Sequence, residues 1–225
     1  MRIDYKKVIQ ARENRSSRLP NPFANYFTSF QQCADAGESV VKGLFPPEFT
    51  PLMERSVVIS TVTAIEVYYR DVLDGMLRYC SPAFFEPHIA KIHDTKYGIS
   101  DLLEMHFHNI HPLELVSSSQ SFQSAEKIEK IFSRFLGKGL WASVLDLKVR
   151  KKDQPDNVVS WCQEDLEGLK ATFSLRHELV HDPARKAFLS GEIVSNLWKA
   201  SHMVFGSDVL LMEIMGKNRD PNLVE

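Results

Sequence analysis

Along most of this chain, apolar residues recur at steps of three and four, and the strict alternation of a half-buried strand is scarce. This spacing predicts amphipathic α-helices. Four long helices are expected, over residues 24–44, 51–79, 157–181 and 190–216. The second is the most regular, because its apolar residues at alternating steps of 4 and 3 define one continuous face: Val58, Val62, Ile65, Tyr69, Val72 and Met76. The sequence therefore predicts an all-α fold, with a four-helix-bundle core in a single domain over residues 1–225.

The boundaries of the first and last long helices are marked in the sequence. Gly43 and the pair Pro46 and Pro47 end the first helix, and Ser190 is placed to cap the last. The residues expected to face the core are Phe27, Phe30, Ala34, Val41 and Leu44 in the first helix, and Val194, Leu197, Val204, Leu211 and Met215 in the last.

Residues 81–150 are predicted to form a mostly helical insertion between the second and third long helices. Short helices are expected over 81–121, where proline, histidine and short apolar runs are mixed. The stretch 122–136 is amphipathic and ends at Gly137, with one apolar side made of Ala125, Ile128, Phe132 and Phe135. The polar run 148–156 is interpreted as a solvent-exposed turn.

Composition and charge narrow the class of protein. With 44% hydrophobic and 25% charged residues, the chain is an ordinary globular protein rather than a disordered one. Its net charge of −2 gives no overall field for nucleic acid, so RNA binding requires a local basic patch. The three cysteines Cys33, Cys80 and Cys162 fit neither a disulfide framework nor a zinc ribbon. Without a signal peptide or a long uncharged apolar stretch, a cytoplasmic protein with no membrane association is expected.

One position breaks the apolar pattern of the third long helix. Its expected inward face is made of Cys162, Leu166, Leu169, Phe173 and Val180, and the position between the last two is Arg176. Arginine is rarely buried unless it is paired or lines a cleft, so Arg176 is expected to face a groove or interface near an anion. Glu66, at the edge of the second helix's apolar face, is a candidate partner that could hold the guanidinium in a two-pronged geometry. The same contact could also be only a buried ion pair.

The segment from Phe173 to Pro183 carries a motif: Arg176, the polar residue His177 directly after it, and His181 close to the helix end. This pattern resembles the signature of the HEPN superfamily (higher eukaryote and prokaryote nucleotide-binding), an Arg-x4-His type motif near the end of a bundle helix. An acidic residue in an early core helix, here Glu66, is also similar to what several such families carry. The resemblance covers the core helices and does not extend to residues 81–121.

The resemblance implies a metal-independent endoribonuclease without a cofactor, acting as a homodimer in a toxin–antitoxin, defence or RNA-processing system. RNA would be the substrate, and an antitoxin protein a further partner. Arg176 would hold the scissile phosphate, and His181 would exchange a proton with the ribose 2′-hydroxyl or the leaving oxygen. His177, Glu66 and Glu178 are supporting candidates. Because Arg176 and His181 are separated by roughly 140° on an ideal helix, pairing of two chains across a twofold axis is expected to bring them together.

Basic and aromatic residues before the third helix are further candidates for RNA contacts. Arg150, Lys151 and Lys152 could contact phosphates beside the site. Trp141 and Trp161 could stack on bases, although a place in the core is the more ordinary role for a tryptophan.

Two other interpretations remain open. The run His177 to His181 is formally H-E-x-x-H, in which two histidines bind zinc and the glutamate acts as general base, with Glu192 as a third ligand. The strand-rich half of a zinc protease is missing, however, and Pro183 ends the helix just after the second histidine. A non-catalytic helical module that binds a nucleotide or a protein is the other interpretation. The additional histidines His93, His106, His108 and His111 are interpreted as loop or surface residues rather than metal ligands.

Overall fold

The computed structural model describes residues 4–16, 18, 20–151, 154–182, 184 and 189–222. Within these residues lie ten helices and one two-stranded antiparallel sheet, which confirms the predicted all-α class. The elements are α1 (Tyr5–Ser16), α2 (Pro22–Val41), α3 (Thr50–Tyr79), α4 (Pro82–Ile92), α5 (Ile99–Phe107), α6 (Pro112–Ser119), α7 (Ala125–Leu136), α8 (Leu140–Leu145), β1 (Lys148–Lys151), β2 (Gln154–Ser160), α9 (Gln163–His181) and α10 (Gly191–Lys217). None of the described helices is long and apolar enough to cross a membrane.

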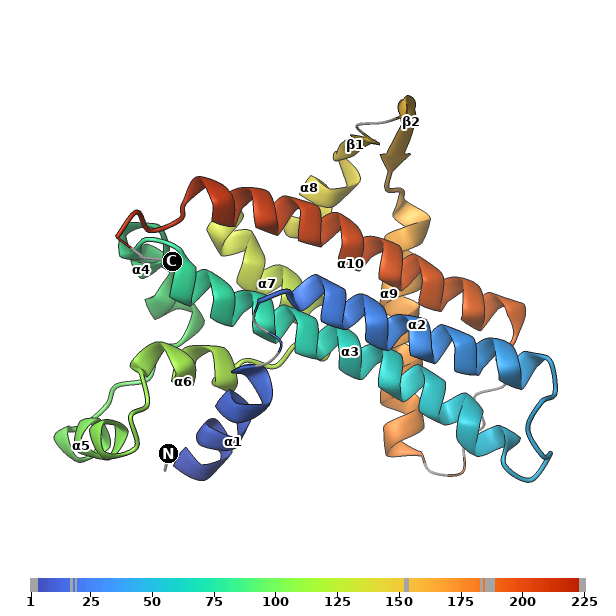
Figure 1. Cartoon of the computed structure of the whole chain (residues 1–225), viewed down its shortest axis with the longest axis horizontal. Helices are drawn as coiled ribbons and strands as arrows, with labels where there is room; N and C mark the ends of the chain where they lie inside the picture. The colour runs from blue at the N-terminus through green and yellow to red at the C-terminus, as the bar shows by residue number, and fades with distance from the viewer. Residues whose placement is uncertain are drawn as a thin grey trace.

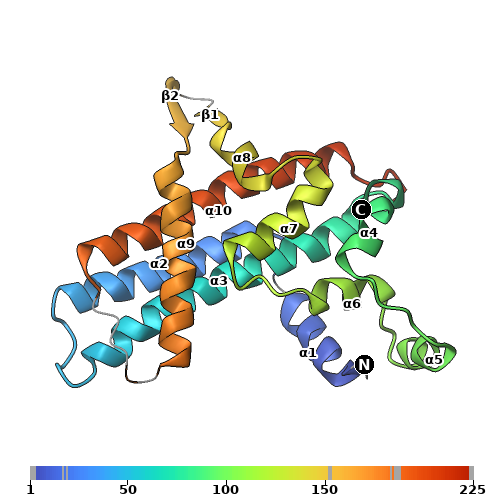
Figure 2. The ribbon, with the colours of Figure 1, turned by 180° about the vertical axis from the view of Figure 1, so that it is seen from behind.

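The four long helices predicted from the sequence, α2, α3, α9 and α10, form the centre of the molecule. Figure 1 shows α2, α3 and α10 lying side by side, with α9 crossing behind them. Seen from behind (Figure 2), α7 lies on the same side of the molecule as α9, and α4 to α6 gather toward one end of the long helices. The insertion between α3 and α9 is mostly helical, as predicted.

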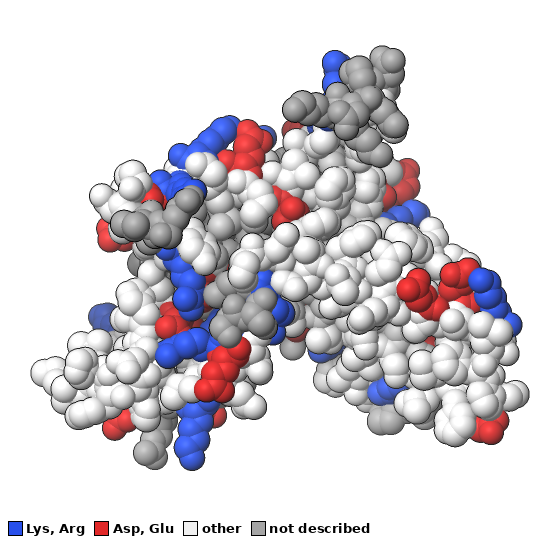
Figure 3. Space-filling view, in the orientation of Figure 1, with Lys and Arg blue, Asp and Glu red and all other residues white. Residues whose placement is uncertain are grey.

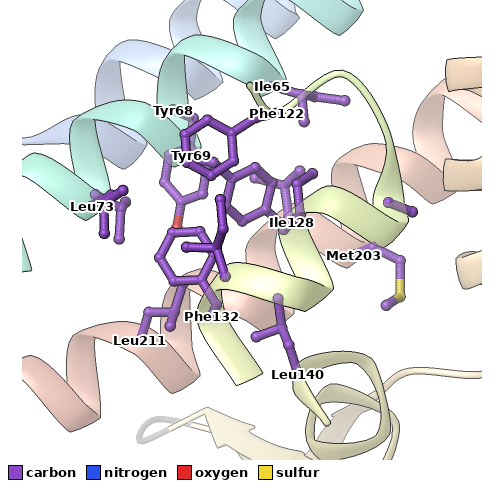
Figure 4. Packing of buried hydrophobic residues seen from close by; sticks show 14 of the residues in the cluster. Ile65, Tyr68, Tyr69, Leu73, Phe122, Ile128, Phe132, Leu140, Met203 and Leu211 are labelled. Atoms are coloured by element: carbon purple, nitrogen blue, oxygen red, sulfur yellow. The ribbon is translucent and has the colours of Figure 1, made fainter. Parts of the chain in front are cut away.

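The main core lies where α3 meets the insertion and α10. All six residues predicted for the inward face of the 51–79 helix are fully buried. Figure 4 shows Tyr69 among the side chains of α7 and α10, with its ring centroid 5.5 Å from that of Phe132. The Tyr69 hydroxyl lies 2.7 Å from the hydroxyl of Ser207, so the buried polar atom has a partner. This packing fixes α3 against α10 and α7, and α3 in turn carries Glu66.

The inward face predicted for α2 was largely wrong. Phe30 is buried, but Phe27, Val41 and Leu44 are 46%, 62% and 69% exposed. The buried residues of α2 are instead Tyr26, Phe30, Gly37 and Val40. The apolar side of this helix is broad, and spacing alone did not identify which part of it is buried. The helix also ends earlier than predicted, at Val41, before Gly43 in a left-handed conformation with φ of 68°.

The third long helix begins later than predicted, and a hairpin precedes it. Residues 157–160 belong to β2, where Val158 and Val159 pair with Arg150 and Val149 of β1. β-branched residues favour such pairing. The run 148–156 is therefore mostly strand rather than a simple turn. The other predicted boundaries were close: Ser190 caps α10 by accepting a hydrogen bond from the Ile193 amide at 3.3 Å, and α4 to α6 are the short helices expected over 81–121.

Candidate functional site

α9 carries most of the candidate residues, and its buried face determines where they point. Leu166, Leu169 and Phe173 are buried, as predicted. The two ends of the predicted face were wrong, because Cys162 is an exposed N-cap residue and Val180 is 40% exposed. Leu179 occupies the core position in the last turn, packed with apolar residues of α3 and α10. Arg176 thus lies at the edge of the buried face, on the side toward α3.

Arg176 meets Glu66 of α3, the contact that the sequence predicted. Nη2 of Arg176 lies 3.5 Å from Oε1 of Glu66, and the two side chains are 19% and 12% exposed. This separation is long for a charge-assisted hydrogen bond. Among the described residues, neither Nε of Arg176 nor Oε1 of Glu66 has a hydrogen-bond partner. The two-pronged geometry is therefore not formed, and both of these unpartnered atoms are buried.

Glu66 has a cationic environment contributed by three helices. Burial raises the pKa of Glu66, while the positive charges of Arg176 (α9), Arg70 (α3) and Lys127 (α7) act to lower it. Sequence reasoning missed Arg70 and Lys127. Arg70 follows Glu66 by four residues, a spacing that places both on one side of a helix and was visible in the sequence. Lys127 comes close only through the packing of α7, which no local pattern indicates.

The histidines of the motif lie on the outer side of the last two turns of α9. His177 and His181 are both exposed, and their ring centroids are 4.3 Å apart. Glu178, between them, is half-buried. Arg176 turns inward to Glu66, and no contact between Arg176 and His181 is found among the described residues. Within one chain, the guanidinium of Arg176 therefore lies at the edge of the buried face, and the imidazoles of His177 and His181 lie apart from it at the surface.

No family model, no curated protein and no solved structure matches this chain. The chemistry of the site must therefore be inferred from its residue types. A partly exposed guanidinium suits a phosphate, and imidazole is the side chain most often used for proton transfer.

Arg150, one of the three predicted RNA-binding residues before α9, lies far from the histidines. Arg150 is exposed on β1, the side chain of Lys151 and all of Lys152 lie outside the described residues, and the hairpin adjoins the N-terminal end of α9 (Figure 2). His181 is the last residue of this 19-residue helix, which is roughly 28 Å long. Arg150 therefore does not contact the same phosphate as His181 of the same chain.

The two tryptophans are core residues. Trp141 and Trp161 are only 5% and 4% exposed. Their indole N–H groups donate to the backbone carbonyls of Ala125, at 3.0 Å, and His202, at 2.6 Å. Base stacking on either ring is therefore excluded in this conformation.

Zinc binding by the H-E-x-x-H segment would need a third ligand beside His177 and His181. Within the described part of the chain, no group of three His, Cys, Asp or Glu side chains is placed to hold a metal ion, so Glu192 does not complete such a set. The other histidines have separate roles. His111 caps α6, its Nδ1 accepting from the Leu113 amide at 3.2 Å, and His93 is bonded to Tyr97 and Ser119. His106 and His108 are exposed.

Proposed function

We propose that this chain is a metal-independent endoribonuclease that acts as a homodimer, with Arg176 binding the scissile phosphate and His181 transferring a proton. The observation that carries the proposal is the state of Arg176. Its guanidinium is held at 3.5 Å from the Glu66 carboxylate, and the Arg176 side chain is 19% exposed. Such a group is positioned by charge, and its exposed part can donate to a phosphate oxygen.

The reaction consistent with these residues needs no added nucleophile. The ribose 2′-oxygen attacks the adjacent phosphorus, the new O–P bond forms, and the bond from phosphorus to the 5′-oxygen of the next nucleotide breaks. One proton leaves the 2′-hydroxyl and one joins the departing 5′-oxygen, and His181 serves as the general base or the general acid. Arg176 offsets the charge that develops on the phosphate oxygens. The products are a 2′,3′-cyclic phosphate and a 5′-hydroxyl.

Supporting roles are assigned by position. Glu66 orients Arg176 through the ion pair, and His177 lies beside His181 with ring centroids 4.3 Å apart. Glu178 is a further supporting residue on the same turn. The three cysteines are free thiols, which is typical of a reducing compartment, so we place the protein in the cytoplasm. Toxin–antitoxin or defence systems, with an antitoxin protein as partner, are the settings that the Arg-x4-His motif suggests.

The test is incubation of purified, metal-analysed protein with total RNA in EDTA, followed by analysis of the fragment ends. We expect cleavage that leaves cyclic phosphates. His181→Ala should lower kcat by about 100- to 10,000-fold, the range for loss of a general acid or base. Arg176→Lys keeps the charge but loses the planar fork, and should also lose most activity. His106→Ala, which changes an exposed histidine on α5, is the matched control and should cleave normally.

Three results would contradict the proposal in distinguishable ways. Undiminished cleavage by an Arg176→Ala/His181→Ala double variant would exclude the mechanism. Activity abolished by EDTA and restored by zinc would indicate the H-E-x-x-H hydrolase instead. An absence of both cleavage and zinc would favour the non-catalytic binding module.

A further inference from the structure

The exposed side of α7 is divided by charge. The helix buries Ala125, Ile128, Ile131, Phe132 and Phe135 against the core. Lys127, Lys130 and Arg134 follow one another at steps of three and four, so they share one side of the helix. Glu129 points elsewhere, since its Oε2 accepts a hydrogen bond from the Trp141 amide of α8 at 2.9 Å. The side of α7 that carries these three cations is separate from the side that meets α8, and the exposed Glu126, four residues before Lys130, is the acidic residue at its border.

This basic stripe, defined as Lys127, Lys130 and Arg134, begins at the candidate site. Lys127 is one of the cations that act on the pKa of Glu66, the residue that pairs with Arg176. α7 contacts α9, and Figure 2 shows α7 lying beside α9 on the same side of the molecule. Lys130 and Arg134 follow in the next turns of α7, so the stripe extends from the neighbourhood of Arg176 over the surface of the insertion.

The stripe is not neutralised by the ion pairs found within the described part of the chain. Those pairs use other cations, among them Arg12, Arg18, Lys42 and Lys217, and involve neither Lys130 nor Arg134. Lys130 is exposed, and Arg134 is partly exposed. Because the whole chain carries a net charge of −2, attraction for a polyanion must come from a local patch such as this one.

We propose that Lys127, Lys130 and Arg134 form a phosphate-binding track that guides single-stranded RNA to Arg176. That the track leads to a catalytic residue rests on the proposed ribonuclease function. RNA binding along α7, however, can be measured without cleavage. The stripe spans about 10 Å along the helix axis, enough for two or three successive phosphates of one strand. Its contacts are to the backbone, so we expect little dependence on base sequence.

The test measures binding of a fluorescent single-stranded RNA with 2′-O-methyl riboses, which cannot be cleaved by 2′-hydroxyl attack. Lys130→Gln/Arg134→Gln removes two charges and keeps long side chains. The matched control, Lys42→Gln/Lys217→Gln, removes two exposed lysines outside the stripe. For the stripe variant, the slope of log affinity against log salt should become shallower by about 1.4, at about 0.7 for each phosphate contact. The control should keep the slope of the unsubstituted protein, and thermal unfolding should show that both variants are folded.

The outcomes separate this proposal from the proposed function. A stripe variant with the unsubstituted protein's affinity and salt slope would overturn the track, even if cleavage by Arg176 and His181 were demonstrated. A protein that binds no single-stranded RNA would overturn it as well. If the slope becomes shallower as expected but no RNA is cleaved, the track stands and the ribonuclease mechanism fails.

Discussion

Two glycines of α10, Gly206 and Gly216, differ in what a side chain would meet. A Cβ at Gly206 would lie 2.6 Å from Cγ1 of Val144 and 2.7 Å from the indole of Trp161, whereas a Cβ at Gly216 would have nothing within 4 Å. We expect Gly206→Ala to lower the free energy of unfolding by about 1–3 kcal/mol through overpacking. Gly216→Ala should raise it by up to about 1 kcal/mol, because alanine favours the helix. Chemical denaturation of both variants tests this, and equal shifts would contradict the packing seen around Gly206.

A second residue of α10 gives a prediction for pH. Burial raises the pKa of Asp208, and the hydrogen bond from the Tyr68 hydroxyl, 2.9 Å from Oδ1, acts to lower it. A carboxyl whose pKa is higher in the native state than in the unfolded state binds more protons when folded. Stability is therefore lost as pH rises from the ordinary aspartate value of about 3.9 through the raised native value. The loss is complete above that interval.

Asp208→Asn keeps a hydrogen-bond acceptor for Tyr68 and removes the titration. The variant should lose less stability than the unsubstituted protein as pH rises through that interval, so its stability relative to the unsubstituted protein should increase. Denaturation midpoints measured across a series of pH values provide the comparison. Parallel pH profiles for the two proteins would show that Asp208 does not titrate with a raised pKa.

The pairing of Arg176 with Glu66 could be predicted from the sequence because Arg176 interrupts one regular apolar face and Glu66 lies at the edge of another. A charged side chain at such a position needs a partner or must line a cleft. The apolar faces of two adjacent core helices contain few charged residues that could be that partner. Lys127 could not be predicted in this way. The proximity of Lys127 to Glu66 depends on how α7 packs. The spacing of residues within α7 does not predict where the exposed side of α7 lies relative to α9.

At the scale of elements, the sequence was informative where one face is apolar and the other polar. α7 has this character, and the residues predicted to be buried on it are buried. Those predicted on the 51–79 helix are buried too, but this helix also buries apolar residues outside the predicted face: Val57, Tyr68, Leu73 and Leu77. α2 has one broad apolar side on which Tyr26 and Phe27, and likewise Val40 and Val41, are neighbours, so the prediction selected Phe27 and Val41 when Tyr26 and Val40 are inside. The hairpin was missed because a strand pair this short gives little alternation, and its stability depends on pairing that sequence spacing does not show.

The molecule as a whole has two unlike faces. On the face seen in Figure 3, charged side chains are sparse over the middle, where α2 and α10 lie. Phe27 and Trp198, from these two helices, are 46% and 49% exposed and line one groove. The opposite face, seen in Figure 2, carries α9 and α7, the elements of the motif and of the basic stripe. The proposed chemistry therefore belongs to the α9 side, and a dimer that completes the site must pair through or beside α9.

Such a dimer predicts complementation between two inactive variants. Arg176 turns toward Glu66 while His181 lies exposed at the helix end, so each site is expected to combine Arg176 of one chain with His181 of its second copy. Arg176→Ala and His181→Ala proteins should each be inactive alone. After the two are unfolded together and refolded as a mixture, half of the dimers should be mixed, and each mixed dimer has one intact site of two. Roughly a quarter of the original RNA cleavage should then return. If both residues act within one chain, the mixture stays as inactive as its components, and a protein that remains monomeric at the assay concentration would exclude the shared site altogether.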